Sequence, residues 1–275
     1  MQAGRIGFIG GGNMARSLIG GLIKGGDKCS NISVSDPSAE KLAELASTFG
    51  INTATDNQSL AESVDILVLA VKPQIMREIA EEIAPQVRTA KPLLISIAAG
   101  VREKDINRWV GGGAAIVRTM PNTPALVQSG ATALYANEEV TPEQKDQAES
   151  VLRAVGITLW VSDETKLDTV TALSGSGPAY FFLIMEILEA AAIELGLDAN
   201  DARLLTLETA FGASKMALSS GESPADLRNR VTSPGGTTEA ALNVFANNNL
   251  GAIFKDALEA AQARGLELGK QLGDS

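Results

Sequence analysis

The stretch Arg5–Ala15, which reads RIGFIGGGNMA, decides the fold of this chain. A short apolar segment runs into three glycines, and residues suited to a helix follow at once. The letters fit G-x-G-x-x-G/A, in which the first glycine makes a tight turn, the second admits a pyrophosphate and the third position lets helix and strand pack closely. A plain glycine-rich turn is the alternative. The pattern predicts a dinucleotide-binding turn at Gly10, Gly11, Gly12, Asn13 and Met14, with Ala15 at the close-packing position.

Strand-like and helix-like segments alternate from this turn to about residue 162. Continuous apolar segments such as Asp65–Val71 and Pro92–Ala98 are typical of strands that are buried on both faces of a parallel sheet. Helical spacing lies between them, for example over Ala39–Phe49 and Pro142–Ala154. The alternation predicts an α/β, doubly wound, Rossmann-type dinucleotide-binding domain over residues 1–162.

Beyond Asp163 the strand pattern ends and helical spacing continues to the end of the chain. We expect long helices from Pro178, over Ala199–Ser219 and from Gly251 to about Leu272, with shorter ones between them. The segment Ala179–Met185 is apolar on every face, so it needs cover from a domain core or from another subunit. Residues 163–275 are therefore expected to form an all-α domain, and homodimerisation would help to bury its apolar helices.

Composition excludes several classes of function. The net charge of −10 argues against nucleic acid and anionic membranes as partners. A single cysteine fits a reducing cytoplasm, and we expect neither a signal peptide nor a membrane span. The chain of 275 residues holds no histidine, so it lacks the commonest general acid–base group and the commonest metal ligand. We expect no metal site, and chemistry carried by hydroxyls, lysines, carboxylates and backbone dipoles.

Asp36 lies about 20 residues beyond the glycines, where folds of this kind place an acid on the adenosine ribose. There its charge would repel a 2′-phosphate and favour NADH over NADPH. The adjacent Ser35 could instead hydrogen-bond that phosphate. A second alternative is that Asp36 only caps the helix that begins at Ser38. These alternatives stay open at this point.

Further candidates follow the next strands, because ligands bind at the carboxyl ends of strands in an open α/β sheet. Lys72 follows one apolar strand and is well placed, with a solvated surface lysine as the alternative. The small residues Ala98 and Ala99 follow another and would let a flat ring lie against the backbone. Asn122, between two prolines, could meet a carboxamide or could form a structural Asx turn.

Two glycine-serine segments in the second half suggest an anion site. Ser233–Thr238 reads SPGGTT and would expose consecutive backbone N–H groups at a helix start, which suits a carboxylate. Ser174–Gly177 repeats the arrangement before the helix at Pro178. An ordinary helix-capping loop is the alternative in both places. Together they indicate a small anionic substrate.

A nicotinamide fold needs a hydride acceptor, and a carbonyl acceptor also needs a proton donor. The β-hydroxyacid dehydrogenases share this two-domain plan and carry a lysine on the long helix after the glycine loop, whereas Pro178–Leu183 here contains none. An imine nitrogen can arrive protonated, so the iminium accepts hydride directly. The protein then needs only to orient it and to hold a hydrogen bond to nitrogen.

Five motifs together resemble the pyrroline-5-carboxylate reductase family over nearly the whole chain. They are Gly10–Ala15, Ala70–Pro73, Met120–Pro124, Ser174–Tyr180 and Ser233–Thr238. The resemblance implies reduction of 1-pyrroline-5-carboxylate to L-proline with NADPH or NADH, the last step of proline biosynthesis. It also implies a homodimer through interleaved C-terminal helices, often assembled five at a time into a decamer.

The resemblance also assigns roles to residues. Thr238 would hydrogen-bond the ring nitrogen as the catalytic residue, and Glu164 would lie near the substrate ring. The substrate carboxylate would be held by Ser233, Gly235, Gly236 and Thr237. Besides the glycine turn, the dinucleotide would be lined by Ser35, Asp36, Asn57, Ala70, Val71, Lys72, Pro73, Ala98, Ala99 and Asn122.

Two other functions remain compatible with these motifs. One is a β-hydroxyacid dehydrogenase-like or other imine-reducing oxidoreductase, against which the missing lysine weighs only for the hydroxyacid enzymes. The other is a dinucleotide-binding protein without catalytic activity, which uses its helical domain only for association. Turnover of pyrroline carboxylate, of hydroxy acids or of neither would distinguish the three.

Overall fold

The computed structural model describes residues 4–274, and these divide into two compact units. The first, here called the sheet unit, comprises the chain up to Ser176 together with the segment from Ala260 onward. The second, the helical unit, is Gly177–Glu259. This division differs from the expected boundary at residues 162 and 163, because the short helix Lys166–Val170 and the end of the last helix pack on the sheet. The functional division of the chain stays a prediction.

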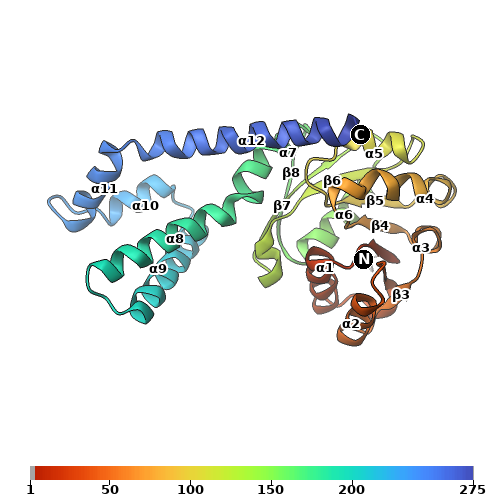
Figure 1. Ribbon diagram of the computed structural model, residues 1–275, viewed down its shortest axis with the longest axis horizontal. Coiled ribbons are helices and arrows are strands. Elements are labelled where there is room, and N and C mark those ends of the chain that lie inside the picture. The colour runs from red at the N-terminus through yellow and green to blue at the C-terminus, as the bar shows by residue number, and fades with distance from the viewer. Residues whose placement is uncertain (1–3, 275) are drawn as a thin grey trace. The chain divides into compact units, whose positions relative to one another are not determined.

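The sheet unit is built on an eight-stranded sheet in the order β3-β2-β1-β4-β5-β6-β7-β8 (Figure 1). All neighbouring strands are parallel except β6 and β7. The chain leaves β1 on one side for β2 and β3 and returns on the other for β4, so the expected doubly wound fold is confirmed. The strands are β1 (Ile6–Ile9), β2 (Ile32–Ser35), β3 (Asn52–Ala54), β4 (Ile66–Leu69), β5 (Leu93–Ser96), β6 (Ile116–Met120), β7 (Gly130–Ala136) and β8 (Gly156–Trp160).

Helices cover both faces of this sheet, and β4 shows why. Its residues alternate between two cores: Val68 packs with one cluster and Leu67 and Leu69 with the other, and all three are fully buried. The first cluster is covered by α1 (Asn13–Lys24), α2 (Ala39–Phe49) and α6 (Pro142–Arg153). The second is covered by α3 (Asn57–Ser63), α4 (Met76–Ala90), α5 (Glu103–Trp109) and the last turns of α12 (Leu250–Asp274).

Two helices of the sheet unit have no clear signal in the sequence. Both α3 and α5 are only seven residues long, too short for an apolar period to stand out. A local sign exists for α3, since the side chain of Asp56 accepts a hydrogen bond from the backbone of Ser59 as an N-cap. α4 begins at Met76, after a 3₁₀ turn over Pro73–Ile75.

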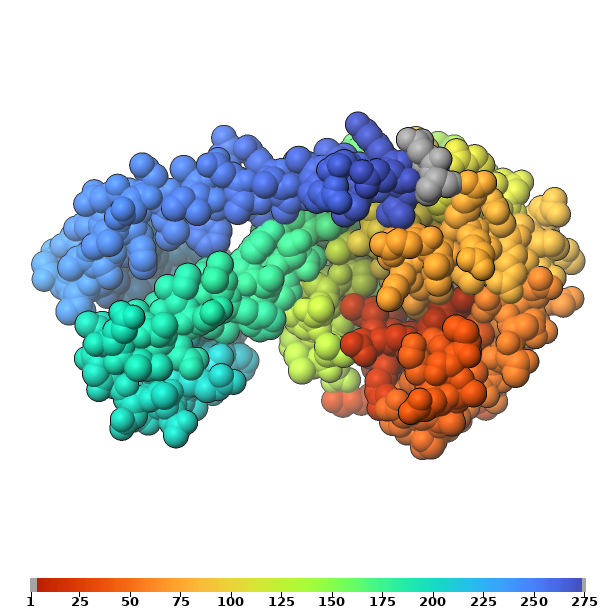
Figure 2. Space-filling model, in the orientation of Figure 1, coloured from red at the N-terminus to blue at the C-terminus, as the bar shows by residue number. Residues whose placement is uncertain are grey.

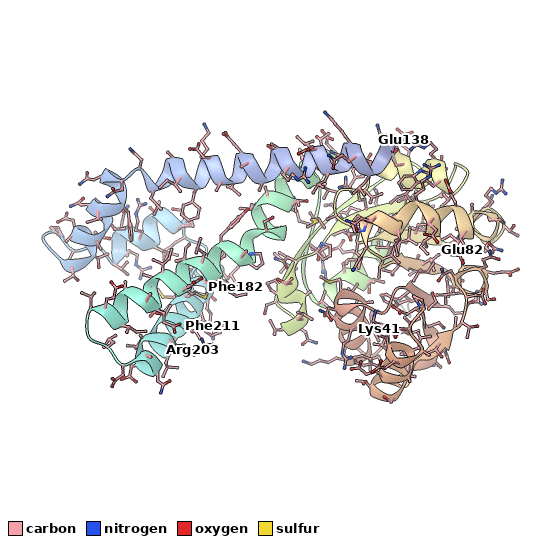
Figure 3. The ribbon with its side chains drawn as sticks, viewed as in Figure 1. Lys41, Glu82, Glu138, Phe182, Arg203 and Phe211 are labelled. Atoms are coloured by element: carbon pink, nitrogen blue, oxygen red, sulfur yellow. The ribbon has the colours of Figure 1, made fainter. Side chains whose placement is uncertain are left out.

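The helical unit contains α8 (Gly177–Glu194), α9 (Ala199–Ser220), α10 (Pro224–Arg230), α11 (Thr237–Asn247) and the first part of α12, up to Glu259. Phe182 of α8 and Phe211 of α9, labelled in Figure 3, are 64% and 63% exposed. So much apolar surface on one chain needs a partner to cover it.

One helical stretch meets the length and hydropathy expected of a membrane span. It is Lys166–Glu194, where α7 (Lys166–Val170), a π-helical turn and α8 follow without a break, and its most apolar window has a mean hydropathy of 1.4. The stretch is not a continuous apolar segment in the sequence, because serines, glycines and Glu186 interrupt it. Only 6% of that window is buried within the chain.

We expect Gly21→Ala to destabilise the sheet unit. A Cβ at Gly21 of α1 would lie 2.5 Å from the carbonyl oxygen of Ala154, so α1 and α6 would have to separate. Such overpacking costs about 1–3 kcal/mol, measurable as a lower urea midpoint at fixed protein concentration. Gly20→Ala is the matched control: its Cβ would meet only the ring of Phe49, and alanine favours the helix by up to about 1 kcal/mol. Equal midpoints for both variants would contradict the close approach.

Candidate functional site

The glycine turn leaves the start of α1 open. Gly10 has a φ of +99°, and a Cβ there would lie 2.5 Å from the carbonyl oxygen of Ala70, so only glycine fits. Gly12 is the N-cap of α1 and provides no side-chain hydrogen bond to the helix. A Cβ at Gly12 would meet nothing within 4 Å. The first N–H groups of α1 thus face open space, as a helix that binds phosphate requires.

A cavity of about 640 Å³ lies beside this turn, at the carboxyl ends of β1, β2 and β4. That volume is in the range of small-ligand sites. Its walls come from residues 9–82, coloured red to orange in Figure 2, and Lys41 of α2 and Glu82 of α4, labelled in Figure 3, are among them. The sequence-predicted residues that it brings together are Gly10, Gly12, Ser35, Asp36, Asn57, Ala70, Val71 and Lys72.

The carboxylate of Asp36 accepts two backbone hydrogen bonds, one from the glycine turn and one from the start of the helix that the sequence suggested it would cap. One oxygen accepts the backbone N–H of Gly11 at 2.9 Å, and the other accepts that of Ser38 at 2.9 Å. Lys41 lies 3.7 Å from it, and the side chain of Asp36 is 7% exposed. Ser38 itself caps α2 with its side chain. Asp36 therefore supports the start of α2 and also lines the cavity.

The remaining cofactor candidates lie outside the main cavity. Asn13 and Met14 form the first turn of α1. Ala98 is buried, with its N–H 3.4 Å from the hydroxyl of Ser96. Pro73 and Ala99 line a second cavity of about 480 Å³, together with Gly100, Asp168 and residues of α12.

Asn122 has a structural role in this conformation. Its amide nitrogen donates to the carbonyl oxygen of Ser174 at 3.1 Å, and its amide oxygen accepts the N–H of Ala131 at 2.9 Å. These bonds join the corner after β6 to β7 and to the turn before α8. A nicotinamide carboxamide would have to compete with them.

Glu164 belongs to a buried ionic cluster. Its Oε1 accepts the N–H of Glu103 at the start of α5 at 2.6 Å and the guanidinium of Arg118 at 2.9 Å. Arg118 lies on β6 and is 2% exposed, and burial lowers its pKa although Glu164 favours its charged form. Beside it Arg102 pairs with the buried Asp168 at 2.6 Å. Glu164 is therefore tied to the sheet by a buried arginine.

The burial of this ionic cluster has two further consequences. Within residues 4–274, Nε of Arg118 is one of two buried side-chain polar atoms without a hydrogen-bond partner. Burial also raises the pKa of Glu103, which accepts a hydrogen bond from Asn137 at 2.8 Å. The sequence does carry a sign of this cluster, since Arg118 is a charged residue inside an otherwise apolar strand.

The open loop expected at Ser174–Gly177 is replaced mostly by helix, and anion binding there stays a prediction. Thr171–Gly175 forms a π-helical turn that leads into α8. The N–H of Ser176 donates to the carbonyl oxygen of Thr171, and the hydroxyl of Ser174 donates to that of Val170. Helical hydrogen bonds thus use two of the polar groups that the glycine-serine letters suggested would be exposed.

The segment Ser233–Thr238, in the helical unit, does form a turn before a helix. α11 begins at Thr237, and its N-cap Gly236 offers no side-chain hydrogen bond. Gly235 has a φ of +72° and donates its N–H to Oε2 of Glu239 at 2.8 Å. The turn is largely exposed, with Thr238 half-buried in the first turn of α11. A carboxylate thus already contacts this turn, although it is one from the chain itself.

Among residues 4–274, no group of three or more acidic or cysteine side chains could hold a metal ion.

The glycine turn before α1 and the SPGGTT turn before α11 share a feature: each helix has a glycine as its N-cap and no side-chain cap. A Rossmann-type sheet with an open cavity, followed by a helical unit with an open turn, defines a two-part dinucleotide-dependent oxidoreductase.

Comparison with known proteins identifies the particular family. Residues 164–268 match the family model described as pyrroline-5-carboxylate reductase dimerisation, and residues 5–100 match that of NADP oxidoreductase coenzyme F420-dependent. A pyrroline-5-carboxylate reductase of Pseudomonas aeruginosa is 49% identical over 99% of this chain and 100% of its own length. The chain therefore belongs to the pyrroline-5-carboxylate reductase family.

Solved structures agree. A pyrroline-5-carboxylate reductase from Coxiella burnetii is 48% identical, with a TM-score of 0.94 over 97% of this chain and 99% of that one. The pyrroline carboxylate reductase of Plasmodium falciparum, solved with NADP bound, is 31% identical, with a TM-score of 0.86 over 98% and 99%. The resemblance seen in the motifs is thus confirmed at the level of sequence and fold.

We expect Glu164→Ala to destabilise the sheet unit strongly. The substitution leaves the buried charge of Arg118 without its 2.9 Å partner, and breaking such a pair costs on the order of 3–5 kcal/mol. Glu81→Ala is the matched control, since Glu81 pairs with Arg77 at the surface and such pairs contribute about 0–1 kcal/mol. Urea unfolding of both variants measures the difference, and a small loss for Glu164→Ala would mean that Arg118 finds other partners.

Proposed function

We propose that this chain reduces 1-pyrroline-5-carboxylate to L-proline with NAD(P)H, the last step of proline biosynthesis. The observation that carries the proposal is the likeness to pyrroline-5-carboxylate reductases along 99% of the chain, which includes both the cofactor turn and the SPGGTT turn. The open start of α1 and the cavity beside it support it independently. When bound, the reduced nicotinamide supplies the hydride; the residues of the chain bind and orient.

In the sheet unit, the first N–H groups of α1 at Asn13 and Met14 would hold the pyrophosphate, with Gly12 allowing close approach. The ribose and adenine would occupy the cavity lined by Ser35, Asn57, Val71 and Lys72. The nicotinamide would lie against Pro73, Ala98, Ala99 and Asn122.

In the helical unit, Ser233, Gly235, Gly236 and Thr237 would hold the substrate carboxylate at the start of α11. The helix dipole and the uncapped N–H groups favour an anion there. The N–H of Gly235 now donates to Glu239, so a bound carboxylate would compete with that side chain.

The catalytic role falls to Thr238. A protonated imine needs no dedicated acid, so a hydroxyl that orients the ring nitrogen suffices, which fits a chain without histidine. Glu164 would face the substrate ring, and its contact with Arg118 would keep the carboxylate in place.

We propose NADH as the preferred reductant. Asp36 lines the adenosine cavity with a carboxylate that is 7% exposed, so a 2′-phosphate bound beside it would meet its negative charge. The Plasmodium falciparum relative was solved with NADP bound. It is 31% identical to this chain, so the residues that line this cavity can differ between the two proteins.

The quaternary structure follows from the exposed apolar helices. We propose a cytoplasmic homodimer through the helical unit, assembled as a pentamer of dimers. The match of residues 164–268 to a dimerisation domain and the exposure of Phe182 and Phe211 support the dimer.

Thr238→Ala should lower kcat/KM for pyrroline carboxylate by at least about tenfold, since a positioned hydrogen bond contributes about 1–3 kcal/mol. The loss of NADH absorbance on adding the substrate measures it. Thr232→Ala is the control, because the hydroxyl of Thr232 only donates to the carbonyl oxygen of Arg228 within its own helix turn. Full activity of Thr238→Ala would remove this residue from the mechanism. Turnover of hydroxy acids in place of pyrroline carboxylate would favour a β-hydroxyacid dehydrogenase.

Asp36→Ser should shift the ratio of kcat/KM for NADPH over NADH upward by about tenfold or more, because it removes a buried negative charge near the ribose. Affinity for both cofactors should fall, since the hydrogen bonds to Gly11 and Ser38 are also lost. The ratio is therefore the quantity that decides. An unchanged ratio would mean that Asp36 acts only as a support for the turn.

A further inference from the structure

A chain of two hydrogen bonds crosses the adenosine cavity from β2 to α4. The hydroxyl of Ser35 lies 2.7 Å from Oδ1 of Asn57, and Nδ2 of Asn57 lies 2.9 Å from Oε2 of Glu82. All three residues line the cavity, and Ser35 is 2% exposed. Glu82 lies on α4 and is labelled in Figure 3, and the sequence by itself assigns it no role.

The chemistry of Glu82 determines the direction of both bonds. A carboxylate has no proton to donate, so the group of Asn57 that faces Glu82 must be its NH₂. The amide oxygen then faces Ser35. A hydroxyl has a single proton, so Ser35 must use it on this oxygen. The direction follows from Glu82 and does not depend on how the amide is assigned.

The consequence reaches the ligand through Ser35. Its proton is committed to Asn57, so only oxygen lone pairs remain for a bound nucleotide. A ribose 2′-hydroxyl can donate to such an acceptor. A 2′-phosphate brings further acceptors and negative charge, and it finds no donor there.

We propose that Glu82 is a positioning residue that makes the adenosine site select a free 2′-hydroxyl, by orienting Asn57 and, through it, the hydroxyl of Ser35. The inference rests on the proposed assignment of this cavity to the adenosine half of the dinucleotide. It differs from the effect of Asp36, which acts directly by its charge. Glu82 acts through two hydrogen bonds, and removing Ser35 must cancel its effect.

The test uses Glu82→Gln in the full-length protein, with binding of NADP⁺ and NAD⁺ measured by titration calorimetry. Glutamine keeps the size of the side chain but can donate as well as accept, so Asn57 can reverse and Ser35 can turn its proton toward a phosphate. We expect the affinity ratio of NADP⁺ over NAD⁺ to rise about five- to tenfold, the net effect of about one hydrogen bond.

Two matched variants separate this relay from simple charge removal. Glu81→Gln removes the same charge one residue earlier on α4, where Glu81 is exposed and pairs with Arg77, and it should leave the ratio unchanged. In a Ser35→Ala background, Glu82→Gln should no longer change the ratio, because the hydroxyl that carries the effect is absent.

An unchanged ratio in Glu82→Gln would overturn the proposal. So would a shift that persists in full in the Ser35→Ala background, since it would show direct electrostatic repulsion by Glu82. If neither nucleotide binds the wild-type protein, the assignment of the cavity fails and the relay with it. If both bind but pyrroline carboxylate is not reduced, the proposed function fails while the ratios still decide the role of Glu82.

Discussion

The close approach of Gly10 to the carbonyl oxygen of Ala70 is the constraint on which the rest of the cofactor half depends. It lets β1 turn sharply beside β4 and directs α1 back across the sheet, with its uncapped first turn at the carboxyl ends of the strands. Any side chain at residue 10 would separate β1 from β4 at the point where the strand order reverses. The cavity opens at this reversal, because the loops after β1 and β4 diverge there to opposite faces of the sheet.

Near that turn, backbone N–H groups stabilise the charge of Asp36 by hydrogen bonds. Asp36 accepts two N–H groups, one from Gly11 in the glycine turn and one from Ser38 before α2, so it holds the turn while it lines the cavity. Deeper in the sheet unit, Arg118 and Glu164 form an ion pair in which each stabilises the charge of the other. An arginine that is 2% exposed needs its carboxylate, and that carboxylate in turn receives the N–H at the start of α5. The ionic cluster connects β6, α5 and the segment before α7.

The helical unit follows a different rule. α8 carries apolar residues all round, and α9 exposes Phe211 as well, so neither helix satisfies its surface within one chain. Both lie in the segment that matches a dimerisation domain. The turn before α11 resembles the turn before α1, because its helix also has a glycine N-cap and no side-chain cap.

The sequence by itself determined the alternation of the longer strands and helices, the cofactor turn and the SPGGTT turn, because glycines, prolines and apolar periods act over a few neighbouring residues. It also led to the family, since those motifs occur in one order along the chain. Only the tertiary structure decided what distant side chains do. It used both ends of the Asn122 amide for structure, replaced the expected loop at Ser174–Gly177 by a π-helical turn, and paired Arg118 with Glu164 across 46 residues. The chain from Ser35 through Asn57 to Glu82 belongs to the same group: its members are 22 and 25 residues apart, and no local pattern indicates which partner each polar group will find.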